Sequence, residues 1–155
     1  MKNTVLEQIL KNEEIRNRIL IGEFDIVLSE ELIAKNVKLG NNGSIKIYIY
    51  PEMTFPKPHI HISASRNIFP DGDAIVCLDR NYQWPHDGHL TILNKKQSED
   101  LDKFMRQPYR YNKSITNWNF AVIYWNENHE NLQIKITEQP DYTKLYCNID
   151  SSSKK

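Results

Sequence analysis

The chain has 155 residues, and its 20 Lys and Arg balance its 20 Asp and Glu, so the formal net charge is zero. This length predicts a single domain over residues 1–150 and a disordered polar tail over 151–155. Neutrality removes any overall attraction to nucleic acid or to an anionic membrane, although it is still compatible with a local cationic patch.

The two cysteines, Cys77 and Cys147, lie far apart and form neither a C-x-x-C pair nor a disulfide framework. A reducing compartment is the default for such a chain. The first residues carry charge within one helical turn, unlike a signal peptide, and no apolar run approaches the ~20 residues of a membrane span. We therefore expect a cytoplasmic protein.

Apolar residues recur every three or four positions over residues 4–20, which predicts an amphipathic N-terminal helix. Thr4 and Glu7 have the spacing of a capping box, and Gly22 is a suitable stop. Residues 24–28 are a short apolar run typical of a strand. Residues 29–34 could instead begin a short helix, so this stretch stays open.

Three strands are predicted next, separated by turn residues. Residues 41–43 read Asn-Asn-Gly, a strong turn signal, and residues 45–50 then alternate with period two. Residues 59–63 alternate in the same way, and 74–78 are a third apolar strand after a turn at 69–73. These strands are expected to form an antiparallel meander.

The C-terminal half has helical patterns. A helix is predicted from Ser98 to Met105 or Arg106, ended by Pro108, and a second over 116–126. Residues 132–136 alternate like a late strand, and coil is expected from Pro140 onward. The predicted fold is therefore α+β, with an N-terminal helix, an antiparallel sheet of about four strands, and two C-terminal helices packed on one face.

Histidines are the most concentrated chemical feature of the sequence. Four of the five form two groups, His59 with His61 and His86 with His89. Alternation puts the first pair on one strand face, and neutral imidazoles with a carboxylate suit Zn²⁺ or Mn²⁺. Asp87 and Asp73 are the candidate carboxylates. The competing interpretation has His59 and His61 on a solvent-facing strand surface and no metal at all.

Two tripeptides, His61-Ile62-Ser63 and His89-Leu90-Thr91, resemble the paired His-x-Ser/Thr motifs of two-histidine phosphoesterases. That resemblance would make the histidines acid and base on a phosphodiester. Only 28 positions separate His61 from His89, far fewer than such enzymes have between motifs.

A second candidate surface mixes cations with aromatic rings. The binding residues proposed from the sequence are Tyr109, Arg110, Tyr111 and Lys113, together with Trp84. Tyrosine and tryptophan are frequent at interfaces because an apolar ring carries a polar group. The competing interpretation is a solvated loop between helices whose tyrosines pack inward.

The strand 45–50, followed by Pro58-His59-Ile60-His61, is similar to small bacterial and phage proteins with a Pro-His-x-His strand. Residues 94–97 with Leu101-Asp102, and Thr116-Asn117-Trp118 with Trp125-Asn126, resemble later elements of that group over roughly residues 45–130. The resemblance implies an α+β fold and a mobile-element or toxin–antitoxin setting. It carries over no catalytic residue.

Together these features favour a non-enzymatic binding protein without a cofactor, which occludes or modulates a macromolecular partner such as a host-defence component. A protein is the expected partner, and nucleic acid is less favoured by the net charge. The alternative is a small Zn- or Mn-dependent hydrolase or nuclease. It would use His59, His61, His86, Asp87 and His89 to activate a metal-bound water.

Overall fold

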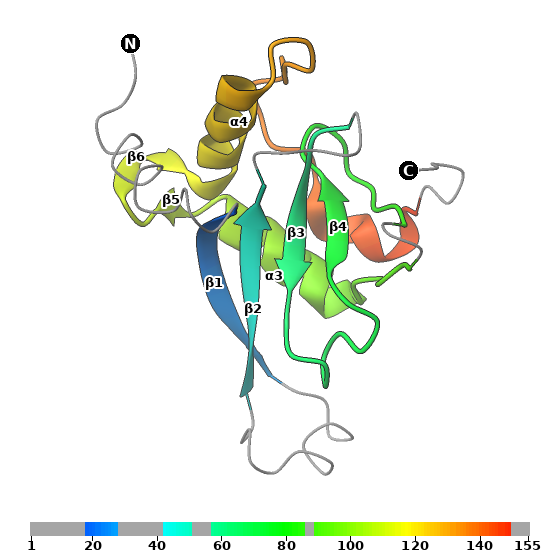
Figure 1. Ribbon diagram of the computed structural model, residues 1–155. Coiled ribbons are helices and arrows are strands. Elements are labelled where there is room, and N and C mark those ends of the chain that lie inside the picture. The colour runs from blue at the N-terminus through cyan, green and yellow to red at the C-terminus, as the bar shows by residue number, and fades with distance from the viewer. Residues whose placement is uncertain (1–17, 28–41, 51–56, 86–88, 150–155) are drawn as a thin grey trace.

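The computed structural model describes residues 18–27, 42–50, 57–85 and 89–149 (Figure 1). Within them the predicted α+β class is confirmed. Four antiparallel strands form one sheet in the order β1-β2-β3-β4. They are β1 (Ile19–Val27), β2 (Asn42–Ile49), β3 (His59–Ser63) and β4 (Ala74–Cys77). A two-residue strand β5 (Pro108–Tyr109) and β6 (Asn112–Thr116) form a separate hairpin.

The N-terminal boundary of the sheet differs from the sequence prediction. Residues 4–17 of the expected helix, and the open helix over 29–34, lie outside the described residues. Ile19 and Leu20 belong to β1 and not to a helix. This strand is rich in β-branched residues, which favour an extended backbone against a neighbouring strand. Asn42 and Gly43, expected in a turn, begin β2, where they pair with Val27 and Ile26.

Alternation along the strands gives the sheet a core face, as predicted. The isoleucines at positions 45, 47, 49, 60 and 62 are fully buried. Ile47 lies opposite Ile62 in the register of β2 and β3. A β-bulge between Leu20 and Gly22 adds one residue to β1. The opposite face, called here the outer face, presents the other half of the alternating residues.

Two α-helices follow the sheet. The first, α3 (Lys95–Met105), begins three residues earlier than predicted because Asn94 forms a capping box with Gln97. It ends at Arg106 before reaching Pro108. The second, α4 (Asn117–Asn128), starts after Thr116, which forms a capping box with Asn119.

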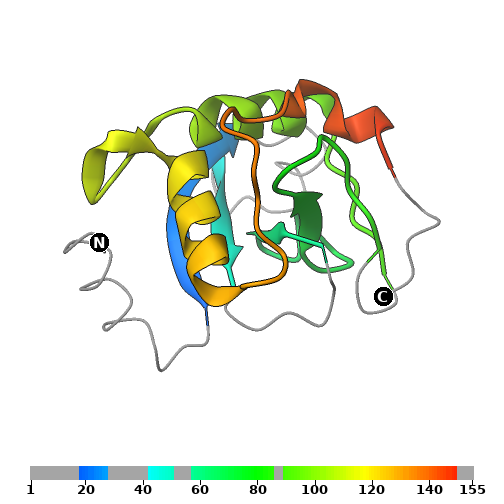
Figure 2. The same cartoon turned by 90° about the horizontal axis from the view of Figure 1, so that it is seen from above.

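The two helices were predicted to pack on one face of the sheet, but they pack in different places. Figure 2 shows α3 in one layer behind the sheet with the 3₁₀ helix η3 (Tyr142–Cys147), where coil was expected. Phe104 of α3 contacts Phe24 of β1 with ring centres 5.2 Å apart. Helix α4 instead contacts β1 and the β5–β6 hairpin. Among the described helices, none is both long and apolar enough to cross a membrane.

The predicted strand over 132–136 is wrong, although the segment is extended. Side chains of α4 satisfy its backbone in place of a neighbouring strand. Asn126 exchanges two hydrogen bonds with the backbone of Ile134, and the indole of Trp125 donates to the Leu132 carbonyl. The alternating pattern therefore reflects one buried residue, Ile134, on a strap that returns toward η3.

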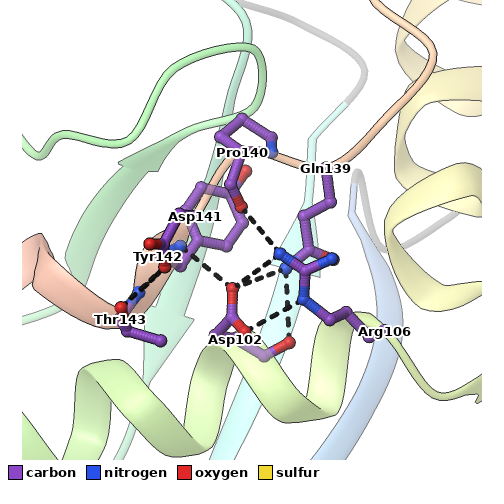
Figure 3. A network of polar contacts seen from close by, with 7 residues as sticks. All are labelled: Asp102, Arg106, Gln139, Pro140, Asp141, Tyr142 and Thr143. Atoms are coloured by element: carbon purple, nitrogen blue, oxygen red, sulfur yellow. Dashed lines mark hydrogen bonds and ion pairs between the residues drawn. The ribbon is translucent and has the colours of Figure 1, made fainter.

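Asp102 of α3 joins the C-terminal segment to the rest of the domain (Figure 3). Its carboxylate accepts hydrogen bonds from the Arg106 guanidinium, the Gln139 amide and the Tyr142 backbone N–H. The Tyr142 hydroxyl in turn donates to the Cys77 carbonyl over 2.8 Å. These bonds hold η3 against both α3 and the edge strand β4.

Candidate functional site

The outer face of β2 carries a row of polar and aromatic side chains. Lys46, Tyr48 and Tyr50 alternate with the buried isoleucines of the same strand. In the register of β2 and β3, Lys46 lies opposite Ser63 and Tyr48 lies opposite His61. Since α3 lies behind the sheet in Figure 1, this row is on the face opposite that helix.

Arg18 joins the row from the residue before β1. Its guanidinium lies 4.0 Å from the centre of the Tyr48 ring, a cation–π contact. A side-chain hydrogen bond with Tyr50 raises the pKa of Arg18. The residue therefore stays fully cationic while its guanidinium lies over an aromatic ring.

His61 and Asp73 form a polar pair beside Tyr50. The Nδ1 of His61 lies 3.4 Å from a carboxylate oxygen of Asp73, and the rings of His61 and Tyr50 are 4.3 Å apart. Burial raises the pKa of Asp73, but hydrogen bonds from His61 and Ser63 outweigh it and leave that pKa lowered. Asp73 is therefore a carboxylate at neutral pH that fixes the orientation of the imidazole.

A groove of about 590 Å³ opens over the β1–β2–β3 part of the outer face. Two cations and one carboxylate line it, namely Arg18, Lys46 and Asp25. The other lining residues are Tyr48, the small or hydroxyl-bearing residues Gly43, Ser44, Ser63, Ala64 and Ser65, and Ile68. The Ser44 hydroxyl is buried and has no hydrogen-bond partner among the described atoms. Such a groove can hold a ligand with anionic, aromatic and hydrogen-bonding groups.

The β3–β4 part of the outer face is closed by packed side chains. His59 is 2% exposed, so its expected position on a solvent-facing strand surface is wrong. Its Nδ1 lies 2.8 Å from the Lys57 carbonyl oxygen, and its ring meets Trp84 edge to face. The residues 82–84 that cross this side supply the cover, which strand alternation alone does not reveal.

The predicted metal ligands are only partly brought together. His59 and His61 share a face, as predicted, with ring centres 5.3 Å apart. The His89 ring packs closely against Gly72. A Cβ added to Gly72 would lie 2.8 Å from the Nε2 of His89. His86 and Asp87 lie outside the described residues. Across those that are described, no three His, Cys, Asp or Glu side chains are grouped to hold a metal ion.

The second tripeptide that resembles a phosphoesterase motif, His89-Leu90-Thr91, forms a hydrogen bond to the turn at Gly72. The Thr91 hydroxyl donates to the Gly72 carbonyl over 2.8 Å, which ties the loop after residue 89 to the turn before Asp73. The turn that carries Asp73 is therefore held by two contacts, one from His61 to Asp73 and one from Thr91 to Gly72. The acid–base roles that the resemblance implies stay a prediction.

The predicted binding residues separate into two groups. Tyr109 and Trp84 are buried, and Tyr109 stacks on Phe120 at 4.1 Å. For these two the prediction of a contact surface is wrong, because their rings fill the interior. Arg110, Tyr111 and Lys113 lie at the surface of the β5–β6 hairpin, with Tyr111 50% exposed.

The binding residues proposed from the sequence did not include Arg18, Lys46, Tyr48 or Tyr50. The polar half of the alternating strand 45–50 was the available signal for three of them. Arg18 had none, because its position was assigned to a helix.

Comparison of the chain with family models, curated proteins and solved structures found no match. The resemblance to small bacterial and phage proteins therefore stays a prediction.

Proposed function

We propose that the protein is a non-enzymatic binding protein that holds single-stranded nucleic acid on the outer face of its sheet. The observation that carries the proposal is the Arg18–Tyr48 pair beside Lys46 in the groove. Sites for single-stranded nucleic acid combine cations that contact phosphates with aromatic rings on which bases stack. An antiparallel four-stranded sheet that displays aromatic side chains is one established platform of this kind.

Local charge supports this partner even though the whole chain is neutral. The β5–β6 hairpin carries two cationic side chains, Arg110 and Lys113, and no acidic one. On the outer face of β1, the acidic Glu23 and Asp25 lie away from the end of the strand where Arg18 stands. Arg18 offers phosphate a cation at one end of the groove, where it also interacts with the Asp73 carboxylate, and Asp25 disfavours phosphate at the other end.

Hydrogen-bonding groups in the groove suit the rest of a nucleotide. The hydroxyl of Ser65, an exposed residue of the groove lining, can donate to or accept from a base edge or a sugar hydroxyl. The Arg18 guanidinium lies 4.0 Å from the centre of the Tyr48 ring, so a cation and an aromatic ring are offered side by side to one nucleotide. Contacts of this type tolerate any base, so little sequence preference is expected.

A protein partner, which the sequence favoured, is the competing interpretation. It would use the same side chains but would not depend on phosphate. The metal-dependent hydrolase or nuclease stays a separate prediction, because His86 and Asp87 lie outside the described residues. Its direct test is metal analysis of the purified protein and of a variant lacking His61.

The proposal is tested with a fluorescein-labelled oligouridylate of about 12 nucleotides, within the site sizes known for sheet-based binders. Fluorescence anisotropy across a salt series gives the affinity and its salt dependence. Tyr48→Leu should weaken binding roughly 5- to 150-fold, the value of one base stack. Arg18→Gln should weaken binding and lower the slope of log affinity against log salt concentration. Arg18→Lys should keep the wild-type slope but lose the affinity that comes from stacking of the guanidinium.

Lys96→Gln is the matched control, because this exposed lysine pairs with Asp100 on α3 and a surface pair contributes little. Its affinity should equal that of the wild type. Failure of the wild type to bind at low salt contradicts the proposal. Retention of a host protein by the wild type, and its loss in Arg18→Gln, would instead support the protein-partner interpretation.

A further inference from the structure

We propose that the β5–β6 hairpin continues the binding path beyond the β1 edge of the sheet, so that Arg110, Tyr111 and Lys113 contact nucleotides that leave the groove. This inference rests on the proposed function and extends it to a second contact surface. The partner is the same single strand of nucleic acid, which passes from one surface to the other.

The hairpin is fixed to the sheet beside the groove. The Arg110 guanidinium donates a 2.9 Å hydrogen bond to the Leu20 carbonyl of β1. Leu20 lies directly opposite Tyr48 in the register of β1 and β2. Neighbouring strands are ~4.8 Å apart, so the hairpin reaches the sheet one strand away from the Tyr48 ring.

The same pairing of cation and ring occurs on both sides of this junction. Arg18 lies 4.0 Å from the Tyr48 ring centre, and Arg110 lies 4.5 Å from that of Tyr111. Tyr111 also meets Tyr109 edge to face, and Tyr109 is stacked on Phe120 in the core. The exposed ring therefore stands on a rigid base, which lowers the entropy cost of using it as a stacking surface.

Charge favours phosphate on the hairpin and gives the path a direction. Arg110 and Lys113 are exposed, and the hairpin carries no acidic residue. The acidic side chains of β1, Glu23 and Asp25, lie toward the opposite end of that strand. A bound strand is therefore expected to leave the groove at the Arg18 end and to cross Leu20 toward Arg110.

The experiment compares two oligouridylates, one of about 4 nucleotides that fits the groove and one of about 12 that reaches the hairpin. Lys113→Gln should weaken binding of the longer probe several-fold and lower its salt slope by about 0.7, the share of one phosphate contact on a single strand. Tyr111→Ala should weaken the longer probe roughly 5- to 150-fold. Neither change should affect the shorter probe.

Controls keep the inference distinct from folding and from the proposed function. Lys113→Arg should bind like the wild type, and Lys144→Gln, an exposed lysine of η3 behind the sheet, should have no effect. If Lys113→Gln and Tyr111→Ala lose equal affinity for both probes, or lose none for either, the hairpin is not part of the binding path, and the groove site is unaffected by that result. If neither probe binds the wild type, the proposed function itself fails.

Discussion

The carboxylate of Asp73 accepts a hydrogen bond from the Nδ1 of His61 across 3.4 Å, at the point where the turn before β4 meets the outer face of β3. The side chain of His61 is 12% exposed and that of Asp73 32% exposed. This pair, together with the Ser63 hydroxyl, fixes one wall of the region beside the groove.

Asp73 should contribute stability that depends on pH. Because the net pKa shift of Asp73 is downward, its ionised form is favoured in the folded chain. The contribution is fully present above the ordinary value of 3.8 and is lost as pH falls through the lower folded pKa. Asp73→Asn should cost about 1 kcal/mol at neutral pH, and the difference should shrink below about pH 4.

Urea unfolding followed by circular dichroism at a series of pH values measures this difference. Asp71→Asn is the matched control, since Asp71 is an exposed carboxylate in the same turn. A difference between wild type and Asp73→Asn that stays constant down to pH 3 would show that the carboxylate makes no ionisation-dependent contact.

The two thiols should react at very different rates. Burial and a hydrogen bond to Asp79 raise the pKa of Cys77 to about 12, whereas Cys147 is exposed. Only the thiolate is nucleophilic, so Cys77 should react slowly with a thiol reagent at pH 8. We expect one rapidly titrated thiol per chain, abolished by Cys147→Ser and retained in Cys77→Ser. Two fast thiols in the native protein would contradict the closed packing of β4.

Much of the sheet was predictable because its strands alternate strictly. The isoleucines of β2 and β3 define one buried face, and the capping residue Thr116 marks the start of α4. The β1 strand was not predictable in the same way. Its isoleucines also fit a helical period, and the decision between strand and helix is made by pairing with β2, a long-range contact.

The candidate site was only half predictable for a related reason. Alternation places His59 and His61 on one strand face, but it does not show that Trp84 covers His59 and is itself buried. Nor does it show that Tyr109 turns inward while Tyr111, two positions later, turns outward. Such differences depend on loops whose course is set by single bonds, like the one from Arg110 to Leu20.

Asp102 should matter more for stability than its partly exposed position suggests. It accepts bonds from Arg106, Gln139 and the Tyr142 backbone, which join α3 to the C-terminal segment (Figure 3). Asp102→Ala removes the acceptor of the Arg106 Nε and of the Tyr142 backbone N–H and should cost about 1–3 kcal/mol. Hydrogen exchange should show faster opening at residues 139–147.

The control for this prediction is Asp141→Ala. Asp141 is exposed and accepts only from the backbone and hydroxyl of Thr143, so it stabilises one local turn. Its loss should cost less than about 1 kcal/mol and leave exchange elsewhere unchanged. Equal destabilisation by the two variants would mean that the bonds across the segment add nothing beyond a local cap.

Gly22 should be intolerant of a side chain because Phe104 occupies the space where its Cβ would lie. An added Cβ would be 2.6 Å from the Cζ of Phe104, closer than real Cβ contacts. Gly22→Ala should therefore destabilise the fold by about 1–3 kcal/mol through overpacking. Phe104→Leu removes the Cζ atom, so it should cost less in the Gly22→Ala background than in the wild type.

A double-mutant cycle by urea unfolding measures that coupling, which should exceed about 0.5 kcal/mol in the favourable direction. Additive costs would show that β1 shifts to admit the methyl group without involving Phe104. The same cycle bears on binding, because β1 positions Leu20 against Arg110 and follows directly on Arg18. If Gly22→Ala displaces β1, it should weaken oligonucleotide binding, and Phe104→Leu should restore it.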